Sequence, residues 1–383
     1  MSVLQIIPRL DAGGAERTTI DIAAALINAG HHALVVSEGG RMEDELRATG
    51  ADLLKLPVAS KNPVTIIRNI RRLKTIITQH KIALVHARSR APAWSAFYAT
   101  QQTGIPFVTT HHGTYTARSA WKRWYNSVMF RGDAIIANSE WTADRIRADS
   151  TNKPKRLETI PRGIDLSQFD PSLISAQTRT ALREDWGANE DSCVVLLPGR
   201  LTRWKGQLVL IEALTRLSEA SQIPAGMHVV IAGDAQGRDS YVEEIRHAVA
   251  KADLRNTVTL TGHITDMPSA YMAADIVIST STTPEAFGRI PVEAGAMQRV
   301  VIATDHGGAR ETVLPGKTGL LVPPGDAPAL GQALARVMAY SEEQRQEMSA
   351  KARAHVKAQF SLEKMCADTI ALYVNLARSA GIS

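Results

Sequence analysis

Short, continuous runs of apolar residues recur along the whole chain, at intervals that leave room for a helix between them. The first half contains VLQIIP, HALVVS, IALVHAR, PFVTTH and DAIIANS, and the second contains CVVLLPG, HVVIAG, TVTLTG, DIVIST, RVVIAT and GLLVPP. Continuous rather than alternating apolar runs are typical of strands buried on both faces, as in parallel sheets covered by helices. The sequence therefore predicts an α/β fold with alternating strands and helices.

The intervening segments and one irregular stretch indicate how this fold is divided. Apolar residues recur at helical spacing from Ile20 to Ile27, and Gly30 is a suitable helix stop. The segment IPRGIDLSQFDPS (160–172) holds Pro and Gly without periodicity, which indicates a linker. A chain of 383 residues is also long for one core. We expect domains over 1–165 and 166–360 and a C-terminal helix over 361–383.

The net charge of +6 is concentrated in the first half. Residues 1–165 hold 23 Lys and Arg against 14 Asp and Glu, a balance of +9, and the remainder hold 21 against 24, a balance of −3. Such asymmetry suits an anionic lipid, an acidic substrate or nucleic acid, with a solvated surface as the plainer alternative. No nucleic-acid-binding motif is present, so we expect no nucleic-acid partner.

Cysteine content and hydropathy indicate the cellular compartment in which the protein is expected. Cys193 and Cys366 are the only cysteines, which predicts no disulfide framework and a reducing environment. The start, MSVLQIIPRL, has no basic segment before a long apolar one, and no run reaches the roughly 18 apolar residues of a membrane span. We expect a cytoplasmic protein.

The loops that follow the predicted strands carry the candidate chemistry, because ligands of open α/β sheets bind at the carboxyl ends of strands. LPGRLTRWKGQ offers Arg200 and Lys205, two cations suited to the oxygens of a diphosphate or simply solvated. In TPEAFGRIPVEAGAM (283–297) we expect a helix to begin near Phe287 and Gly288, where free amides suit an anion.

Two carboxylates flank that expected helix start. Glu285 precedes it and Glu293 lies inside it, so the two should not touch, although both can face one ligand. Carboxylates accept hydrogen bonds from hydroxyls, which suits a sugar-bearing nucleotide. The alternative is a pair of ordinary helix-start acids, each stabilised by about 0.3–1 kcal/mol.

Further motifs follow other strands: DAGGAER, whose glycines suit a phosphate or merely a turn, THHGTY, and DHGGARE. These motifs resemble those of the retaining GT-B glycosyltransferases of family four, or group 1, and the resemblance extends over nearly the whole chain. It also includes IPRGID, GRLTRWKG, GKTGLLVPPGD and two Glu separated by seven residues around Phe-Gly. The resemblance implies two Rossmann-like, doubly wound domains facing a cleft, with the C-terminal helix crossing back to the first domain. It implies sugar transfer from a nucleotide diphosphate sugar to a hydroxyl acceptor with retention, and no cofactor besides that co-substrate.

The resemblance also implies roles by position. Arg200 and Lys205 would hold the diphosphate, Glu285 would contact the transferred sugar and Glu293 the ribose. His112, with His111 as the alternative, would lie near the reacting carbon. Arg162 stands where many members have Asn, and we draw no function from it. The other expected donor contacts are Gly13, Gly14, Gly262, His263, Phe287, Gly288 and Arg289.

The basic first half is the expected acceptor side, with Arg88, Arg90 and His111 just past strand ends. RSAWKRWYN mixes aromatics with cations, which suits an anionic membrane surface or lipid-linked acceptor, or else a packed helix with a solvated basic face. No Asp-x-Asp occurs, so we expect no metal. The expected biology is cell-envelope glycan or lipopolysaccharide assembly.

Two alternatives remain open at this point. A nucleotide-sugar epimerase of the same architecture would convert the donor without an acceptor. A non-catalytic nucleotide-sugar-binding protein would keep the same residues without turnover, since an intact site does not prove catalysis.

Overall fold

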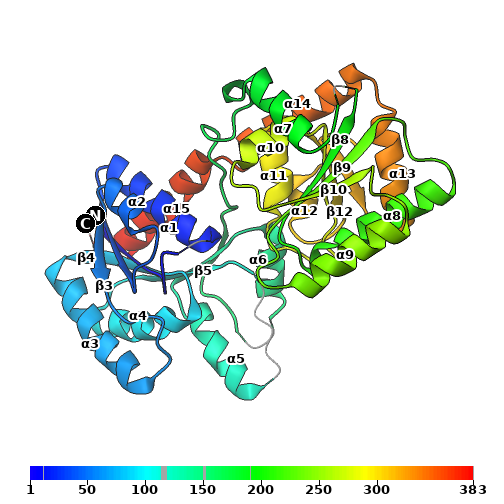
Figure 1. Cartoon of the computed structure of the whole chain (residues 1–383). Helices are drawn as coiled ribbons and strands as arrows, with labels where there is room; N and C mark the ends of the chain where they lie inside the picture. The colour runs from blue at the N-terminus through cyan, green and yellow to red at the C-terminus, as the bar shows by residue number, and fades with distance from the viewer. Residues whose placement is uncertain (12, 114–118, 150–151, 190, 383) are drawn as a thin grey trace. The chain divides into compact units, whose positions relative to one another are not determined.

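The structure is a computed structural model that describes the whole chain except residues 12, 114–118, 150–151, 190 and 383. Backbone contacts divide it into two compact units, Met1–Gly163 with Leu362–Ser383, and Ile164–Ser361. Each unit is built on one parallel sheet with helices on both faces (Figure 1).

The first unit contains a seven-stranded sheet in the order β3-β2-β1-β4-β5-β6-β7, with parallel pairing throughout. Its strands are β1 (Ser2–Ile6), β2 (His32–Ser37), β3 (Asp52–Lys55), β4 (Ile82–Ala87), β5 (Phe107–His111), β6 (Ala134–Ala137) and β7 (Leu157–Thr159). Its helices are α1 (Gly14–Asn28), α2 (Glu43–Ala48), α3 (Pro63–Gln79), α4 (Arg90–Thr103), α5 (Ala120–Ser127), the short η1 (Val128–Phe130), α6 (Glu140–Arg147) and α15 (Leu362–Ser379).

Successive side chains of β1 enter two different cores, as the alternation of a strand requires. Val3 packs in the cluster that includes Leu26 of α1 and Tyr373 of α15. Leu4 packs in the cluster that includes Leu73 of α3 and Trp94 of α4. Helices α1 and α15 therefore cover one face of the sheet, and α3 and α4 cover the other. The last helix belongs to the first unit, which confirms the expected return of the chain.

The second unit contains a six-stranded parallel sheet in the order β10-β9-β8-β11-β12-β13. Its strands are β8 (Cys193–Pro198), β9 (Met227–Ala232), β10 (Val258–Gly262), β11 (Ile276–Ser279), β12 (Val300–Thr304) and β13 (Gly319–Val322). Its helices are η2 (Pro171–Leu173), α7 (Ala176–Asp185), η3 (Arg203–Lys205), α8 (Gln207–Glu219), α9 (Asp239–Lys251), α10 (Met267–Ala273), α11 (Arg289–Ala296), α12 (Ala309–Thr312), α13 (Ala327–Met338) and α14 (Glu342–Gln359).

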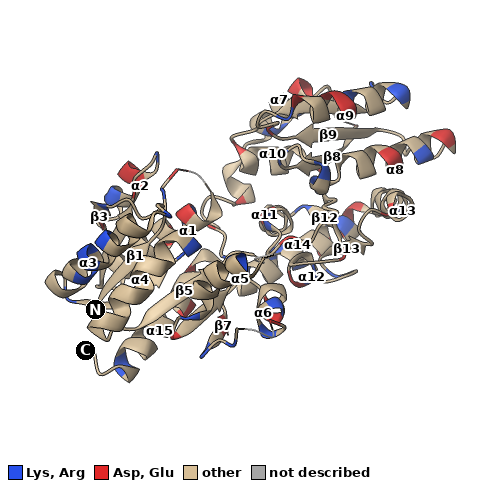
Figure 2. Ribbon diagram, turned by 90° about the horizontal axis from the view of Figure 1, so that it is seen from below, with Lys and Arg blue, Asp and Glu red and all other residues tan. Residues whose placement is uncertain are grey.

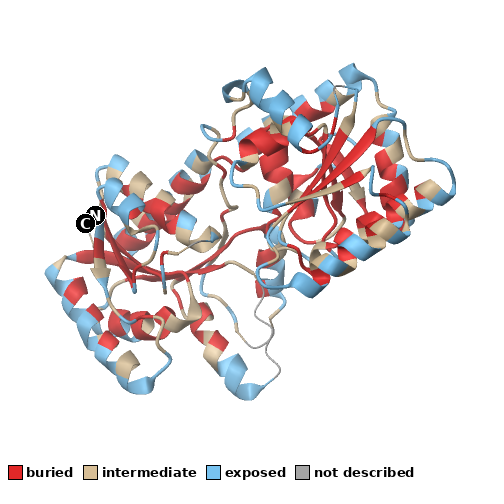
Figure 3. Ribbon diagram, viewed as in Figure 1, coloured by how far each residue is buried: buried red, intermediate tan, exposed pale blue. Residues whose placement is uncertain are grey.

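The second sheet also separates two cores. Val195 of β8 packs in the cluster that holds Leu214 of α8 and Val337 of α13, whereas Leu196 packs in the one that holds Val292 of α11 and Val356 of α14. Figure 3 shows the central strands of both sheets as buried almost throughout. Burial on both faces explains why these strands are continuous apolar runs in the sequence.

Every apolar run quoted above forms a strand, which confirms two doubly wound α/β units. Two strands were not predicted, β3 and β7, and both lie at the edges of the first sheet. Edge strands are short and partly exposed, and here Asp52 and Lys55 of β3 face solvent, so neither segment carries a continuous apolar run. Within the described part of the chain, no helix is long and apolar enough to cross a membrane.

Candidate functional site

In the second unit, the loop after β8 carries the two predicted cations around an aromatic ring. Arg200 is exposed, with its guanidinium carbon 5.8 Å from the centre of the Trp204 ring. The ammonium of Lys205 lies 4.7 Å from the same ring centre. Gly206 then turns the chain into α8 with φ 76°, and a Cβ there would lie 2.0 Å from the carbonyl oxygen of Thr280. Glycine therefore lets this loop lie directly against the end of β11.

The close approach brings Lys205 to Glu285, on the loop that follows β11. Lys205 Nζ donates to Glu285 Oε1 at 2.8 Å, and both side chains are largely buried, with exposures of 11% and 22%. Ser281 Oγ donates to the same oxygen. The structure thus joins the lysine of LPGRLTRWKGQ to the first glutamate of TPEAFGRIPVEAGAM.

A third loop, after β12, supports the segment around Glu285. The amide of Gly308 donates to the carbonyl of Glu285 at 2.8 Å. A Cβ on Gly308 would lie 2.4 Å from the carbonyl oxygen of Phe287, and one on Gly307 would lie 2.3 Å from that of Glu285. The Gly-Gly pair of DHGGARE therefore allows close backbone packing beneath the Glu285 loop.

Helix α11 begins at Arg289, with Gly288 as its N-cap in the left-handed region at φ 74° and with no capping side chain. The sequence predicted this start near Phe287 and Gly288. The first amides of a helix have no partner within the helix, and its dipole favours a negative charge there. An anion bound at this helix start would therefore lie next to the loop that carries Glu285.

Glu293, one turn into α11, is buried and has its own partners. Its Oε2 accepts a hydrogen bond from the Tyr271 hydroxyl at 2.8 Å, and its Oε1 lies 2.6 Å from Nη2 of Arg289. Burial, then the Glu293 charge, raises the pKa of Tyr271 well above its usual value, so the phenol stays protonated as a donor. Glu285 and Glu293 contact different partners, as the predicted turn between them implied.

Gly262 and His263, two of the predicted donor contacts, lie at the exposed end of β10. Gly262 has φ 74°, and its carbonyl accepts from the amide of Gly233 at 2.7 Å. Among the described residues, no hydrogen bond or ion pair joins His263 to Arg200, Lys205 or the two glutamates.

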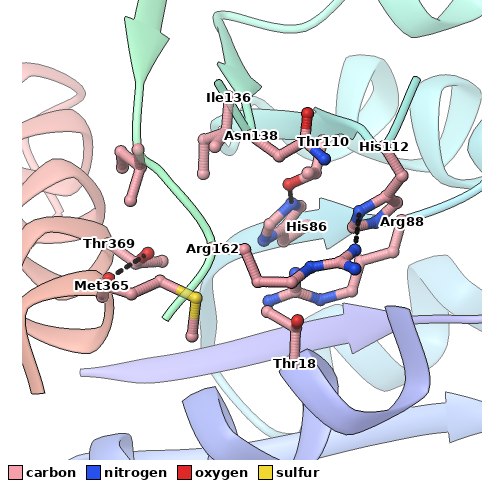
Figure 4. A pocket seen from close by; sticks show the side chains of 11 residues that line it. Thr18, His86, Arg88, Thr110, His112, Ile136, Asn138, Arg162, Met365 and Thr369 are labelled. Carbon is pink, nitrogen blue, oxygen red and sulfur yellow. Dashed lines mark hydrogen bonds between the residues drawn. The ribbon is translucent and has the colours of Figure 1, made fainter. Parts of the chain in front are cut away.

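In the first unit, a small cavity of about 20 Å³ lies at the carboxyl ends of β4 and β5 (Figure 4). Space of this size holds about one water molecule. Its lining includes Arg88 and His112, two of the predicted residues, together with Arg162 from the segment after β7. Gly14 lies close to the same group, since a Cβ there would stand 2.2 Å from Nη1 of Arg162.

Arg88 is a buried cation held by a neutral partner. Its Nε and Nη2 donate to Gln5 Oε1 at 3.0 and 2.7 Å, and Gln5 Nε2 donates to the carbonyl of Thr19 at 3.0 Å. Among the described residues, no carboxylate lies within ion-pair distance of Arg88. Burial lowers the pKa of its guanidinium, because a buried charge without a counter-ion is costly.

His112 presents a hydrogen-bond donor to this cavity. Its Nδ1 accepts from Arg162 Nη2 at 3.2 Å. Burial, and then the nearby charges of Arg162 and Arg88, lowers the pKa of His112 well below its usual value. The neutral ring therefore carries its proton on Nε2, a buried atom with no partner among the described residues. That N–H is suited to a ligand oxygen.

His111 and Arg90 are directed elsewhere. His111 Nε2 donates to the carbonyl of Met129 at 3.2 Å, and burial lowers its pKa to about 4. Arg90 begins α4 and donates to Asn126 Oδ1 at 2.8 Å, beside a separate groove. Gly13, at φ 146°, precedes α1 as its N-cap. Of the predicted first-unit residues, only Arg88, His112 and Gly14 gather around Arg162.

Models of two glycosyltransferase families match successive parts of this chain. "Glycosyltransferase Family 4" matches residues 12–168, and "Glycosyl transferases group 1" matches residues 178–355. A crystal structure of a glycosyltransferase from Rickettsia africae ESF-5 is 32% identical, with a TM-score of 0.89 over 98% of both chains. The chain belongs to the family 4, or group 1, glycosyltransferases.

Two further relatives of this family 4 chain carry functional names. Anabaena Alr3699/HepE, solved in complex with UDP-glucose, is 26% identical, with a TM-score of 0.78 over 97% of this chain and 99% of that one. The lipopolysaccharide core biosynthesis mannosyltransferase LpsB of Rhizobium meliloti (strain 1021) is 28% identical over 258 residues, 67% of this chain and 69% of LpsB. The chain spans only 53% of the length of the first curated relatives it matches, which are D-inositol 3-phosphate glycosyltransferases.

Several residues of this family 4 chain that shape the two sites were not predicted. Tyr271 and Ser281 hold the two glutamates, and Gln5 holds Arg88. No motif marks them: Tyr271 and Gln5 act through partners 22 and 83 residues away, and Ser281 lies four residues before Glu285. Arg162 was noted only as a departure from the usual Asn, and its contact with His112 gives that departure a structural consequence.

Proposed function

We propose that this protein transfers a sugar from a nucleotide diphosphate sugar to a hydroxyl acceptor, with retention of anomeric configuration. The observation that carries the proposal is the pairing of Lys205 with Glu285 at the carboxyl edge of the second sheet. Arg200 lies in the same loop as Lys205, and the start of α11 follows Glu285. Cations, helix amides and a carboxylate in one cluster of loops suit a ligand that carries phosphates and hydroxyls.

The difficult step in such a transfer is the departure of a negatively charged nucleoside diphosphate. The Lys205 ammonium has three donors, so it can keep Glu285 and also donate to a phosphate oxygen. Lys205 and Ser281 both donate to Oε1 of Glu285 and so fix the orientation of the carboxylate. Oε2 can then accept a hydrogen bond from a sugar hydroxyl. In this proposal, Lys205, Arg200 and the α11 amides stabilise the leaving group.

We propose the ribose contact for Glu293. Its Tyr271 partner is buried, but its Arg289 partner is about half exposed. A ribose hydroxyl can therefore take the place of Arg289 at Oε1 while Tyr271 keeps Oε2 fixed. The exchange replaces the contact with the half-exposed Arg289 by a hydrogen bond from the ribose to the same ionised carboxylate.

We also propose that the reaction needs no divalent metal. The sequence contains no Asp-x-Asp, and Arg200 and Lys205 supply positive charge to the same group of loops. Transfer should therefore proceed fully in the presence of a chelator. Activity that disappears with EDTA and returns with manganese would contradict this proposal.

For the acceptor, we propose a glycan or lipid-linked glycan of the cell envelope, as in lipopolysaccharide assembly, at the inner face of the membrane. The name of the relative LpsB and the basic first half of the chain support this choice. Flotation with liposomes tests the membrane contact: binding should require anionic lipid and weaken with salt. Equal flotation with zwitterionic liposomes would argue against it.

A thermal-shift panel of nucleoside diphosphates and their sugars tests the donor proposal, beginning with UDP-glucose. A ligand at 100 times its Kd adds about 2.7 kcal/mol to the unfolding free energy. One base should stabilise the protein far more than the others, and Lys205→Ala should remove the shift. No stabilisation by any member of the panel would contradict the proposal.

A further inference from the structure

A second, larger hollow lies in the first unit, between α3, the start of α4 and α5. Its volume is about 620 Å³, within the roughly 300–1,000 Å³ of small-molecule sites. Ile66, Ile67 and Ile70 of α3 line one side, and Trp121 and Trp124 of α5 line another. We call this hollow the α3–α5 groove.

Stacked aromatic rings extend from the core into the α3–α5 groove. Trp94 is buried, and its ring centroid lies 4.4 Å from that of Trp124, which in turn lies 4.8 Å from that of Trp121. Trp94 also stacks on Tyr98, with the two ring centroids 6.1 Å apart. Trp121 is 71% exposed and Ile67 is 54% exposed. Large apolar side chains grouped at the surface mark a binding site rather than an ordinary solvated face.

The charged side chains that line this groove are all basic. Between Asp52 and Asp133 the chain contains no Asp or Glu and thirteen Lys or Arg. Figure 2 accordingly shows basic but no acidic residues along α3. Lys61, Arg90 and Lys122 belong to the groove lining itself. A partner with a negative group is therefore attracted, and one with excess positive charge is repelled.

The lining also distinguishes between anionic partners. A glycan needs planar polar side chains for its many hydroxyls, but the described lining residues include no Asp, Glu, Asn or Gln. The isoleucine and tryptophan side chains instead offer an apolar surface for a hydrocarbon chain. The three cations can bind one phosphate group. The chemistry of the groove is that of an amphiphile with an apolar chain and an anionic head.

We propose that the α3–α5 groove binds the hydrocarbon chain of a single anionic lipid, with its phosphate held by Lys61, Arg90 and Lys122. The identification of this lipid with the carrier of the acceptor rests on the proposed glycosyltransferase function; the binding site itself does not. The site takes one chain out of a bilayer or micelle, which differs from adsorption to a membrane surface.

Binding of decyl phosphate, added as monomers to the full-length protein, tests the site through tryptophan fluorescence. We expect saturable binding, and about fourfold weaker affinity for each CH₂ removed from the chain. Inorganic phosphate should not bind measurably, and decanol should bind at least about tenfold more weakly than decyl phosphate. A decyl phosphate brominated near the end of its chain should quench the fluorescence.

Two surface variants and one matched control make this test specific. Ile67→Glu and Trp121→Ala alter exposed residues, so both should fold normally and weaken decyl phosphate binding at least tenfold. Trp141→Ala, on α6 in the same unit, should bind as the unchanged protein does. Binding to vesicles but not to monomers, or equal binding to a neutral oligosaccharide, would overturn the proposal. Donor thermal shifts measured on the same samples report separately on the glycosyltransferase proposal.

Discussion

The ammonium of Lys205 lies 2.8 Å from the carboxylate of Glu285, although 80 residues separate them in sequence. The contact joins the loop after β8 to the loop after β11, two adjacent strands of the second sheet. Both side chains are largely buried, so removal of one partner leaves the other as a buried charge without a counter-ion, which is destabilising. This pair links the stability of the second unit to the binding of its proposed ligand.

Replacement of Lys205 by Ala should slow transfer by at least ~100-fold, since loss of one preorganised donor costs about 2.7–4 kcal/mol. It should also destabilise the second unit, because Glu285 loses its counter-ion. Lys205→Ala combined with Glu285→Gln should recover stability but not activity. Steady-state rates and urea unfolding on the same samples check both. Recovery of activity in the double variant would mean that Lys205 acts only on structure.

The two glutamates should respond differently to amide substitution. Glu285→Gln should lower kcat, since the charge near the transferred sugar is lost. Glu293→Gln should mainly raise the KM for the donor. Tyr271→Phe, which removes the hydrogen bond to Glu293 without changing the carboxylate, should resemble a mild Glu293→Gln. If Glu285→Gln changed only KM, the assignment of Glu285 to the sugar would be wrong.

Gly308→Ala should displace the segment that carries Glu285. The new methyl group would lie 2.4 Å from the backbone oxygen of Phe287, so the segment must shift. We expect a loss of about 1–3 kcal/mol in unfolding free energy and a clear loss of donor affinity. Gly331→Ala is the control, because Gly331 lies within α13 and a Cβ there would meet its nearest neighbour, the side chain of Leu217, at an ordinary 3.5 Å. It should leave donor affinity unchanged, and equal losses in the two variants would contradict the argument.

Acid should destabilise the protein through its buried histidines. The pKa of His111 falls from 6.5 to about 4 on folding, so the unfolded chain takes up a proton first as the pH decreases. The stabilisation is complete above pH 6.5 and is lost progressively towards pH 4, by about 3 kcal/mol for this group. His86 and His112, whose pKa values are also lowered by burial, should add to the loss.

Denaturant unfolding between pH 7.5 and 4.5 measures this loss. His111→Asn should be less stable near neutrality but lose less stability per pH unit between 6.5 and 4.5. Its hydrogen bond to Met129 can be kept by the amide, which makes it a better comparison than His111→Ala. An unchanged slope in His111→Asn would mean that another group controls the acid response.

The sequence determined most of the fold because central parallel strands are apolar on both faces. It did not predict β3 and β7, since an edge strand such as Asp52–Lys55 is short and begins and ends with an exposed charged residue. The start of α11 was predicted to within a residue or two from the turn residues before it. The strand order could not be derived from these runs alone, because it depends on how the helices pack.

For the sites, the sequence located the loops but not the partners within them. Lys205 and Glu285 were each predicted to contact the donor, whereas their contact with each other requires β8 and β11 to be neighbours. Tyr271 carries no motif, and it reaches Glu293 only because α10 packs against α11. The meeting of Arg162 with His112 likewise depends on the path of the chain after β7.

The most direct test of the proposed function is anomer-resolved NMR of the product. The unchanged enzyme would be incubated with its stabilising nucleotide sugar, an envelope acceptor and EDTA. We predict a new glycosidic bond with the donor's anomeric configuration, one nucleoside diphosphate released per bond, and loss of both in Lys205→Ala. An inverted product, or conversion of the donor to another sugar nucleotide without acceptor, would contradict this prediction.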